Sequence, residues 1–199
     1  MAKQVLISLS REYGSGGHYI AEKLSKELGV SLLDRTMLDR ISAEKGIDYS
    51  KLKSYDEVPK NSLLSRKVRG ISSSPEEITA HIQFDYITEK AKAGESFLVV
   101  GRCGDHILKD YDQLITIFIM GDMEDKIKRI MQVRDMTRAE AEKAILRHDK
   151  KRKLYHNYFA NSHWGDSRKY DLLINSSKLG LDRTVDYLKQ YIEERIANQ

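Results

Sequence analysis

Residues 7–24 read ISLSREYGSGGHYIAEKL, and this stretch decides the fold. Its first part belongs to the aliphatic run QVLISLS (4–10), which has the composition of a buried strand. Apolar residues then recur at helical spacing from Ile20 to Leu28, and Gly29 is placed to end that helix. The stretch therefore predicts a strand, a glycine-rich loop and a helix in direct succession.

The loop between this strand and helix has the features of a phosphate-binding turn. Such a turn needs inward-pointing backbone N–H groups, no obstructing side chains and a helix N-terminus behind it. Gly14, Gly16 and Gly17, with Ser15 between them, meet the first two conditions, and a helix from about His18 meets the third. A turn that is rich in glycine only for tight strand–helix packing has the same composition, so both interpretations stay open here.

The loop lacks the lysine of the common pattern G-x-x-x-x-G-K-[ST]. With Gly16 as the last glycine, Arg11 stands at the first glycine position, Gly17 at the lysine position and His18 at the hydroxyl position. The usual lysine neutralises the transferred phosphate, so its charge must come from another residue. Arg11 is the first candidate, because it lies on the loop and is always charged.

Further apolar runs, separated by helical patterns, extend the prediction to the whole chain. Five runs read as buried strands: 4–10, 30–33, 96–101, 114–120 and 170–175. Strands of this kind with helices between them indicate a parallel sheet covered on both faces, whose ligands lie at the carboxyl ends of the strands. The residues at these ends are Ser10–Gly17, Asp34–Arg35, Gly101–Asp105 and Asn175–Ser177.

The helical patterns carry recognisable start signals. Pro75 favours a helix that runs to about Lys92, and Asp122 favours one that begins just after it. Thr137 with Glu140 is typical of a capping box before a long basic helix. The last helix has one apolar stripe: Leu181, Val185, Leu188, Ile192 and Ile196. Residues 46–74 are polar and predict an irregular connection.

Composition excludes several classes of protein. Of 199 residues, 34 are Lys or Arg and 30 are Asp or Glu, and a net charge of +4 is too small to require a nucleic acid partner. No apolar run is long enough to span a membrane. The single cysteine, Cys103, cannot form an intramolecular disulfide or a cysteine-based zinc site, and we read it as a packing residue. These features favour a cytoplasmic protein.

An ordered set of motifs gives the chain a family likeness. The motifs are SREYGSGGHYIA (10–21), LLDRTML (32–38), VVGRCGDHIL (99–108), RDMTRAEAEKAILRHDKKRKLYHNYF (134–159) and WGDSRKYDLLINSSKLGLD (164–182). With them the chain resembles the cytidylate kinase-like family, a branch of the P-loop nucleoside monophosphate kinases in which a GSGG loop without lysine is usual. The resemblance implies a single α/β domain over 1–199, a three-layer P-loop NTPase fold with a five-stranded parallel sheet and a helical lid. Within it, 35–75 would be an acceptor-binding insert and 129–165 the lid.

The same resemblance implies an activity. It implies transfer of a phosphoryl group from ATP, with Mg²⁺, to a nucleoside monophosphate, CMP or dCMP before others. The partners would be small nucleotides, with no nucleic acid and no membrane, and the oligomeric state stays open. Two alternatives remain: a non-catalytic nucleotide- or phosphometabolite-binding protein on the same fold, and a kinase for another small acceptor.

Site residues follow from the matching positions. Donor phosphates and ATP would be bound by the loop and its flanks: Ser10, Gly14, Ser15, Gly16, Gly17, His18 and Tyr19. Catalytic roles would fall to Arg11, Asp34, Arg147 and Arg152, with Arg129 and Arg134 as further lid arginines. Acceptor binding would fall to Arg35, Arg102 and Asp105, and any metal contact to Asp34 through water.

Each of these positions also has a plainer interpretation. Asp34 suits a helix N-cap, Arg102 with Asp105 suits a surface ion pair, and residues 147–153 suit a solvated basic helix face. Arg35 replaces the small hydroxyl residue common in cytidylate kinases, which leaves the acceptor open.

Overall fold

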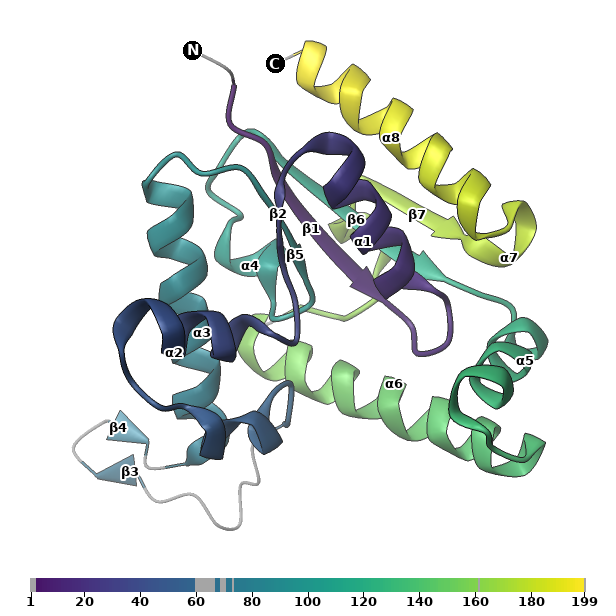
Figure 1. Ribbon diagram of the computed structural model, residues 1–199, viewed down its shortest axis with the longest axis horizontal. Helices are drawn as coiled ribbons and strands as arrows, with labels where there is room; N and C mark the ends of the chain where they lie inside the picture. Colours follow the sequence, from purple (N-terminus) through teal and green to yellow (C-terminus); the bar gives the residue numbers. More distant parts are fainter. Residues whose placement is uncertain (1–2, 60–66, 69–70, 73, 161, 199) are drawn as a thin grey trace.

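The computed structural model describes residues 3–59, 67–68, 71–72, 74–160 and 162–198. A parallel sheet of five strands, in the order β2-β5-β1-β6-β7, lies at its centre (Figure 1). Its strands are β1 Leu6–Arg11, β2 Ser31–Leu33, β5 Phe97–Val100, β6 Leu114–Met120 and β7 Leu172–Asn175. All five match predicted runs, and the predicted parallel sheet is confirmed. Because β1 pairs with both β5 and β6, the glycine loop leaves from the middle of the sheet.

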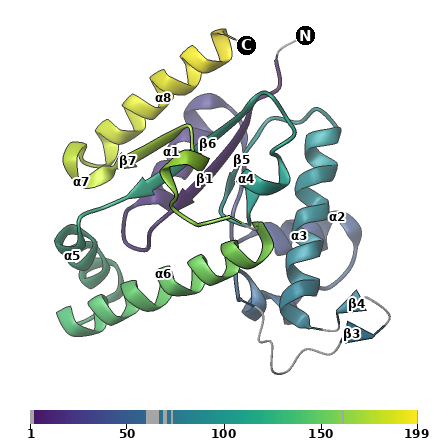
Figure 2. The same ribbon diagram turned by 180° about the vertical axis from the view of Figure 1, so that it is seen from behind.

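Helices cover both faces of the sheet, which confirms the three-layer architecture (Figures 1 and 2). Helices α1 and α8 lie on one face, and α2, α3 and α4 lie on the other. The helices are α1 Gly17–Leu28, α2 Met37–Lys45, η1 Ser50–Tyr55, α3 Pro75–Lys92, α4 Gly104–Ile107, α5 Met123–Arg134, α6 Arg138–Ala160, η2 Ser167–Lys169, α7 Ser176–Leu179 and α8 Leu181–Ala197.

The core divides according to the alternation of side chains along β1. Ile7 and Leu9 pack on the side of α1 and α8, together with the predicted stripe of the last helix. Leu6 points to the opposite face and joins the cluster under α2 and α3. Fully buried apolar side chains on both faces explain why the strand reads as a continuous apolar run.

Most helix signals act as predicted. Glu140 Oε2 accepts from the Thr137 N–H at 2.9 Å, and the Glu140 N–H donates to Thr137 Oγ1 at 3.4 Å, which completes the capping box. Asp122 precedes α5, but its carboxylate accepts from Asn175 Nδ2 at 2.7 Å and does not cap the helix.

The polar connection at 46–74 contains local structure as far as it is described. Helix η1 lies there, and two short strands, β3 Lys67–Val68 and β4 Ile71–Ser72, pair antiparallel. The remaining residues of 60–73 lie outside the described part of the chain, so the acceptor-binding insert at 35–75 stays a prediction.

Helix α6 runs across the carboxyl ends of the strands (Figures 1 and 2). It places its middle turns opposite the glycine loop, where Asp149 Oδ1 accepts from the Tyr13 N–H at 2.6 Å. Together with α5, α6 supplies the helical segment predicted as a lid. Among the described residues, no helix is long and apolar enough to cross a membrane.

Candidate phosphate-binding site

Close packing against neighbouring side chains shapes the glycine loop. Gly14 and Gly16 have φ angles of 84° and 80°, which favour glycine. A Cβ on Gly16 would lie 2.4 Å from Leu181 Cδ2, and one on Gly17 would lie 2.6 Å from Arg11 Cβ. The packing interpretation of these glycines is therefore correct, and it does not exclude a binding role for the loop.

The loop also presents donors to a cavity. Ser15 Oγ donates to Glu12 O at 2.8 Å and accepts from the Gly17 N–H at 3.4 Å, which fixes the turn from inside. His18 and Tyr19 begin α1, and N–H groups in a first helical turn have no partner within the helix. Both residues line a cavity of about 320 Å³. Loop and helix N-terminus thus face one cavity, as anion binding requires.

Arginine dominates the charge around this cavity. Its arginines come from the glycine-loop strand, the ends of β2 and β5, and helices α5 and α6: Arg11, Arg35, Arg102, Arg129, Arg134 and Arg152. Arg129 donates to the Gly14 carbonyl and so ties α5 to the loop. Arg35 and Arg134 are exposed, and neither has an ion-pair partner within the described part of the chain. The cavity therefore favours an anionic ligand.

Arg11 turns toward the cavity, where it meets a carboxylate. Its Nη1 and Nη2 donate to Glu57 Oε1 and Oε2, each at 2.9 Å, in a bidentate pair. Arg152 Nε lies 4.0 Å from Glu57 Oε2, and Arg152 Nη1 donates to the Arg11 carbonyl at 3.3 Å. The Arg102 N–H also donates to Glu57 Oε1, at 3.4 Å. We call Arg11, Arg102 and Arg152, with Glu57, the arginine cluster.

Arg102 is the most deeply placed member of the arginine cluster. Its side chain is 1% exposed; Nη1 donates to Val100 O at 2.7 Å, and Nη2 pairs with Asp56. Arg102 and Cys103 both have positive φ angles, 49° and 53°, so the backbone turns sharply here. Both terminal nitrogens of Arg102 are consequently occupied by protein groups, in contrast to Arg35.

The charges of the arginine cluster shift one another's protonation. Burial would raise the pKa of Glu57, but Arg11, Arg102 and Arg152 outweigh it and hold the pKa well below its usual range. Burial and the neighbouring Arg11 lower the pKa of Arg152 to about 10. Glu57 is accordingly a carboxylate near neutral pH and is unsuited to accept a proton.

Asp34 lies at the end of β2 and keeps one oxygen open. Its Oδ1 accepts from the Thr36 N–H at 2.9 Å and from Thr36 Oγ1 at 2.7 Å, which orders the turn before α2. Its Oδ2 lies 3.7 Å from His18 Nε2. Burial would raise the pKa of Asp34, but the Thr36 hydrogen bonds and the charges of His18 and Arg102 lower it. The N-cap of α2 is Thr36, so the N-cap interpretation of Asp34 is wrong: its Oδ1 orders the turn before the helix, while Oδ2 is available to a ligand.

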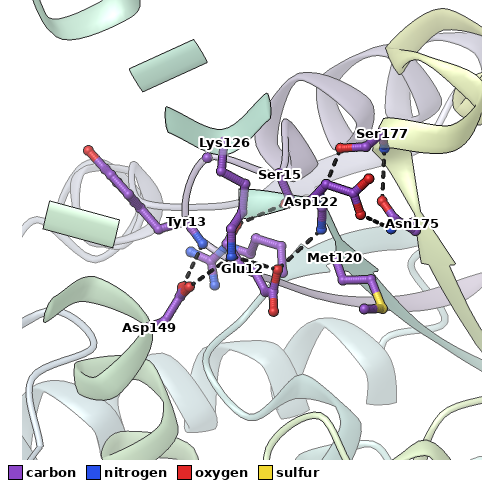
Figure 3. A network of polar contacts seen from close by, with 12 residues as sticks. Glu12, Tyr13, Ser15, Met120, Asp122, Lys126, Asp149, Asn175 and Ser177 are labelled. Carbon is purple, nitrogen blue, oxygen red and sulfur yellow. Dashed lines mark hydrogen bonds and ion pairs between the residues drawn. The ribbon is translucent and has the colours of Figure 1, made fainter. Parts of the chain in front are cut away.

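A second polar network supports the loop from the other side (Figure 3). Lys126 of α5 is 4% exposed, and its Nζ lies 2.9 Å from Glu12 Oε2 and 3.6 Å from Asp149 Oδ2. Glu12 Oε2 also accepts from the Gly121 N–H at 3.1 Å. Burial raises the pKa of Asp149, although the Tyr13 N–H and Lys126 oppose the shift. The loop is thereby connected to β6, α5 and α6.

The predicted site residues divide into three sets. The structure brings most of them to the cavity: Arg11, Gly14, Gly16, Gly17, His18, Tyr19, Asp34, Arg35, Arg102, Arg129, Arg134 and Arg152. Ser10 and Ser15 are buried beneath it. Asp105 lies instead against His156, with Oδ2 2.8 Å from Nε2, and Arg147 is on the exposed face of α6. Neither of these two lines the cavity.

Sequence reasoning missed the acidic partners of the site. Asp56 and Glu57 come from the polar connection, where no pattern separates them from surface acids. Lys126 sits on the buried side of α5, and a lysine among apolar helix positions was the available signal. Among the described residues, no group of three or more acidic, histidine or cysteine side chains could hold a metal ion alone.

Comparison with known proteins shows the fold and the family of the chain. The parallel sheet and central glycine loop define a P-loop kinase fold. A solved shikimate kinase from Bacteroides thetaiotaomicron has a similar fold, with 12% identity, a TM-score of 0.56 and coverage of 95% of this chain and 98% of that one. A gluconokinase from Sinorhizobium meliloti 1021 is also similar, with 11% identity, a TM-score of 0.58 and coverage of 100% of this chain and 97% of that one. The family model for the cytidylate kinase-like family matches residues 6–178, and the chain belongs to that family.

A solved structure with a higher sequence identity has a similar fold. An uncharacterized protein from Eubacterium ventriosum ATCC 27560 is 32% identical, with a TM-score of 0.76, over 96% of this chain and 99% of that one. No curated protein matches the sequence.

Proposed function

We propose that the protein transfers a phosphoryl group from ATP to a small acceptor, with the nucleoside monophosphates CMP and dCMP as first candidates. One observation carries the proposal: a glycine loop at a helix N-terminus and arginines from four other parts of the fold line the same cavity. Family membership supports the class of reaction. A cytoplasmic location fits this proposal, because the single cysteine is buried and unpaired.

The donor phosphates would lie on the loop. N–H groups at the start of α1, at His18 and Tyr19, would donate hydrogen bonds to their oxygens, and Arg152 would supply charge from α6. The residues fit a magnesium nucleotide, because such ions are held by one or two carboxylates together with the phosphates themselves, and Asp34 Oδ2 is open. When bound, Mg²⁺ with ATP supplies an activated phosphoryl group and neutralises part of its charge.

Asp34 suits cation binding better than proton abstraction. Its lowered pKa keeps it ionised, which weakens it as a base and strengthens it as a ligand for a metal-bound water. Its two hydrogen bonds to Thr36 fix the carboxylate, so that Oδ2 is held toward the His18 side of the cavity. Asp34 therefore orients the metal and the acceptor in this proposal.

Acceptor binding would fall mainly to the rim of the cavity. Arg35 and Arg134 are exposed, line the cavity and are free of protein partners among the described residues. The predicted acceptor contact of Arg102 would require release from Asp56, and that of Asp105 would require release from His156. Arg35 is consequently our first acceptor contact, and α5 with α6 would close over the bound nucleotide.

The occupied state of Arg102 also favours a second candidate. A nucleoside monophosphate brings its own phosphate, yet within the described part of the chain Arg102 is held by Asp56, which leaves the rim arginines Arg35 and Arg134 to bind it. An acceptor without phosphate would need fewer cations, and the solved structures of this fold include kinases named for shikimate and gluconate. A kinase for another small acceptor is the runner-up.

A coupled assay with ATP, Mg²⁺ and a panel of acceptors separates these candidates. We expect turnover with CMP or dCMP, and a loss of about 10- to 100-fold in Asp34→Asn, as for residues that hold a metal-bound water. Asp39→Asn is a matched control, because Asp39 is an exposed acid of the adjoining α2. Turnover only with non-nucleotide acceptors would select the runner-up. ATP binding by calorimetry without any turnover would identify a non-catalytic nucleotide-binding protein.

A further inference from the structure

Glu57 lies against the guanidinium groups of Arg11 and Arg152 and the backbone N–H of Arg102. Arg11 binds it through both terminal nitrogens at 2.9 Å, Arg152 Nε lies at 4.0 Å, and the Arg102 backbone N–H donates to it at 3.4 Å. Its side chain is 15% exposed. A carboxylate that accepts a bidentate arginine fork presents two oxygens in the way a phosphoryl group does.

The backbone around Glu57 is shaped to admit this carboxylate. Glu57 itself has a φ of 49°, a conformation that side-chain-bearing residues seldom adopt. Gly101 has a φ of 75°, which favours glycine, and a Cβ there would lie 2.1 Å from Glu57 Oε1 and 2.3 Å from Arg11 Nη1, so this contact between Glu57 and Arg11 depends on glycine. Unusual backbone on both sides of the contact indicates a built site and not an incidental surface pair.

The contact conflicts with phosphate binding by Arg11. Both terminal nitrogens of Arg11 are used by Glu57, and a phosphoryl group at the same fork would meet a negative carboxylate. Arg11, Arg102 and Arg152 all line the cavity that the glycine loop faces, and Glu57 contacts each of them. Either Glu57 leaves when a phosphoryl group arrives, or Arg11 never contacts one.

We propose that Glu57 is an internal carboxylate that fills the arginine cluster in the absence of ligand and is displaced by a phosphoryl group of the bound nucleotide. This inference rests on the proposed function and adds a residue that sets the affinity for phosphates. It also explains how a loop without lysine can leave Arg11 and Arg152 side by side: Glu57 compensates their charge until a ligand does so.

The proposal predicts that a neutral residue at 57 strengthens phosphate binding. An apparent affinity is reduced by the fraction of molecules whose site is free, so a carboxylate seated most of the time lowers it severalfold. We expect Glu57→Gln to bind ATP and inorganic tripolyphosphate about tenfold more tightly than the unaltered protein. Glu57→Asp keeps the charge on a shorter side chain, so its affinity for these phosphates should lie between those of Glu57→Gln and the unaltered protein.

Glu124→Gln provides a matched control. Glu124 also accepts a bidentate arginine fork, from Arg138, and its loss changes the net charge by the same amount. The pair is exposed, however, and lies outside the cavity. Calorimetric titration of the purified full chain should therefore give equal tripolyphosphate affinities for Glu124→Gln and the unaltered protein.

Hydrogen exchange on the unaltered protein tests displacement without a substitution. We expect faster amide exchange in residues 50–57 when tripolyphosphate binds, because Glu57 leaves its partners. Unchanged or slower exchange there would contradict the proposal, and this measurement decides the matter if Glu57→Gln does not fold.

The binding outcomes separate the two proposals. If the unaltered protein and all variants bind neither ATP nor tripolyphosphate, the proposed function fails, and the inference fails with it. If the unaltered protein binds them and Glu57→Gln binds equally or more weakly, Glu57 is a structural counter-ion and only the inference is overturned. Tighter binding by Glu57→Gln but not by Glu124→Gln supports it.

Discussion

Two parts of the same sheet edge, the glycine loop and the arginine cluster, are held in shape by different forces. The loop rests on contacts such as that between Gly16 and the Leu181 side chain, which depend on volume. The arginine cluster rests on Glu57 and Asp56, whose charges offset buried guanidinium groups. The comparison teaches that the packing beneath Gly16 should be indifferent to salt, while the arginine cluster should respond to pH and to phosphate.

The largest effect is expected from removing the buried arginine. Arg102→Ala would leave Asp56 without its guanidinium partner in a poorly solvated place, and breaking a buried pair costs about 3–5 kcal/mol. Arg138→Ala breaks an exposed pair with Glu124, which water screens, and should cost far less. Urea unfolding of both variants measures the difference, and equal losses would show that the arginine cluster is not held by charge.

The loop should fail through volume instead. Gly16→Ala combines backbone strain at φ 80° with a Cβ 2.4 Å from Leu181, and we expect a loss of about 2–4 kcal/mol. Gly46→Ala has a similar φ of 66° with no atom within 4 Å of its Cβ, so only the strain of about 1–2 kcal/mol remains.

The difference between these two glycine variants isolates packing beneath the loop. It should be the same at low and high salt in chemical unfolding experiments, because no charge is involved. A difference that disappears in high salt would mean that the loop, like the arginine cluster, is shaped by charge.

Acid should weaken the arginine cluster with a definite sign. The folded pKa of Glu57 is depressed, so its contribution to stability is present above the unfolded value of about 4.3 and is lost as the pH falls. The stability gap between the unaltered protein and Glu57→Gln should shrink by about 1.4 kcal/mol between pH 7 and about pH 3.3. Unfolding curves at both pH values give this gap, and a constant gap would place Glu57 outside the ionised network.

The same comparison explains what the sequence could predict. The five strands, the loop and the helix starts follow from local signals, because each signal spans only a few consecutive residues. Examples are the apolar run before Gly14 and the Thr137–Glu140 capping box. Cavity residues at strand ends, such as Asp34 and Arg102, followed from the parallel sheet and the family likeness. These features need no knowledge of distant contacts.

The partners of the arginines could not be found in that way. Glu57 lies 46 residues from Arg11, and the polar segment that carries it has no periodicity to indicate which side chain turns inward. Asp149 could be read as the i,i+3 partner of Arg152 on a solvated helix face, whereas its carboxylate accepts from the Tyr13 N–H. Tertiary placement of η1 and α6 decides both contacts.

The smallest effect is expected at Arg147, on the same helix as Arg152. Arg147 is exposed and lies outside the cavity, whereas Arg152 is largely buried against Arg11. Arg147→Ala should therefore change tripolyphosphate affinity and turnover by about twofold or less, as for ordinary surface substitutions. Arg152→Ala should weaken both by well over tenfold, since it removes a cation from the phosphate site. A large loss in Arg147→Ala, measured in the same titrations, would mean that α6 rotates on ligand binding and exchanges the two arginines. The arginine cluster would then be a resting arrangement of the site, with a different set of cations in the working one.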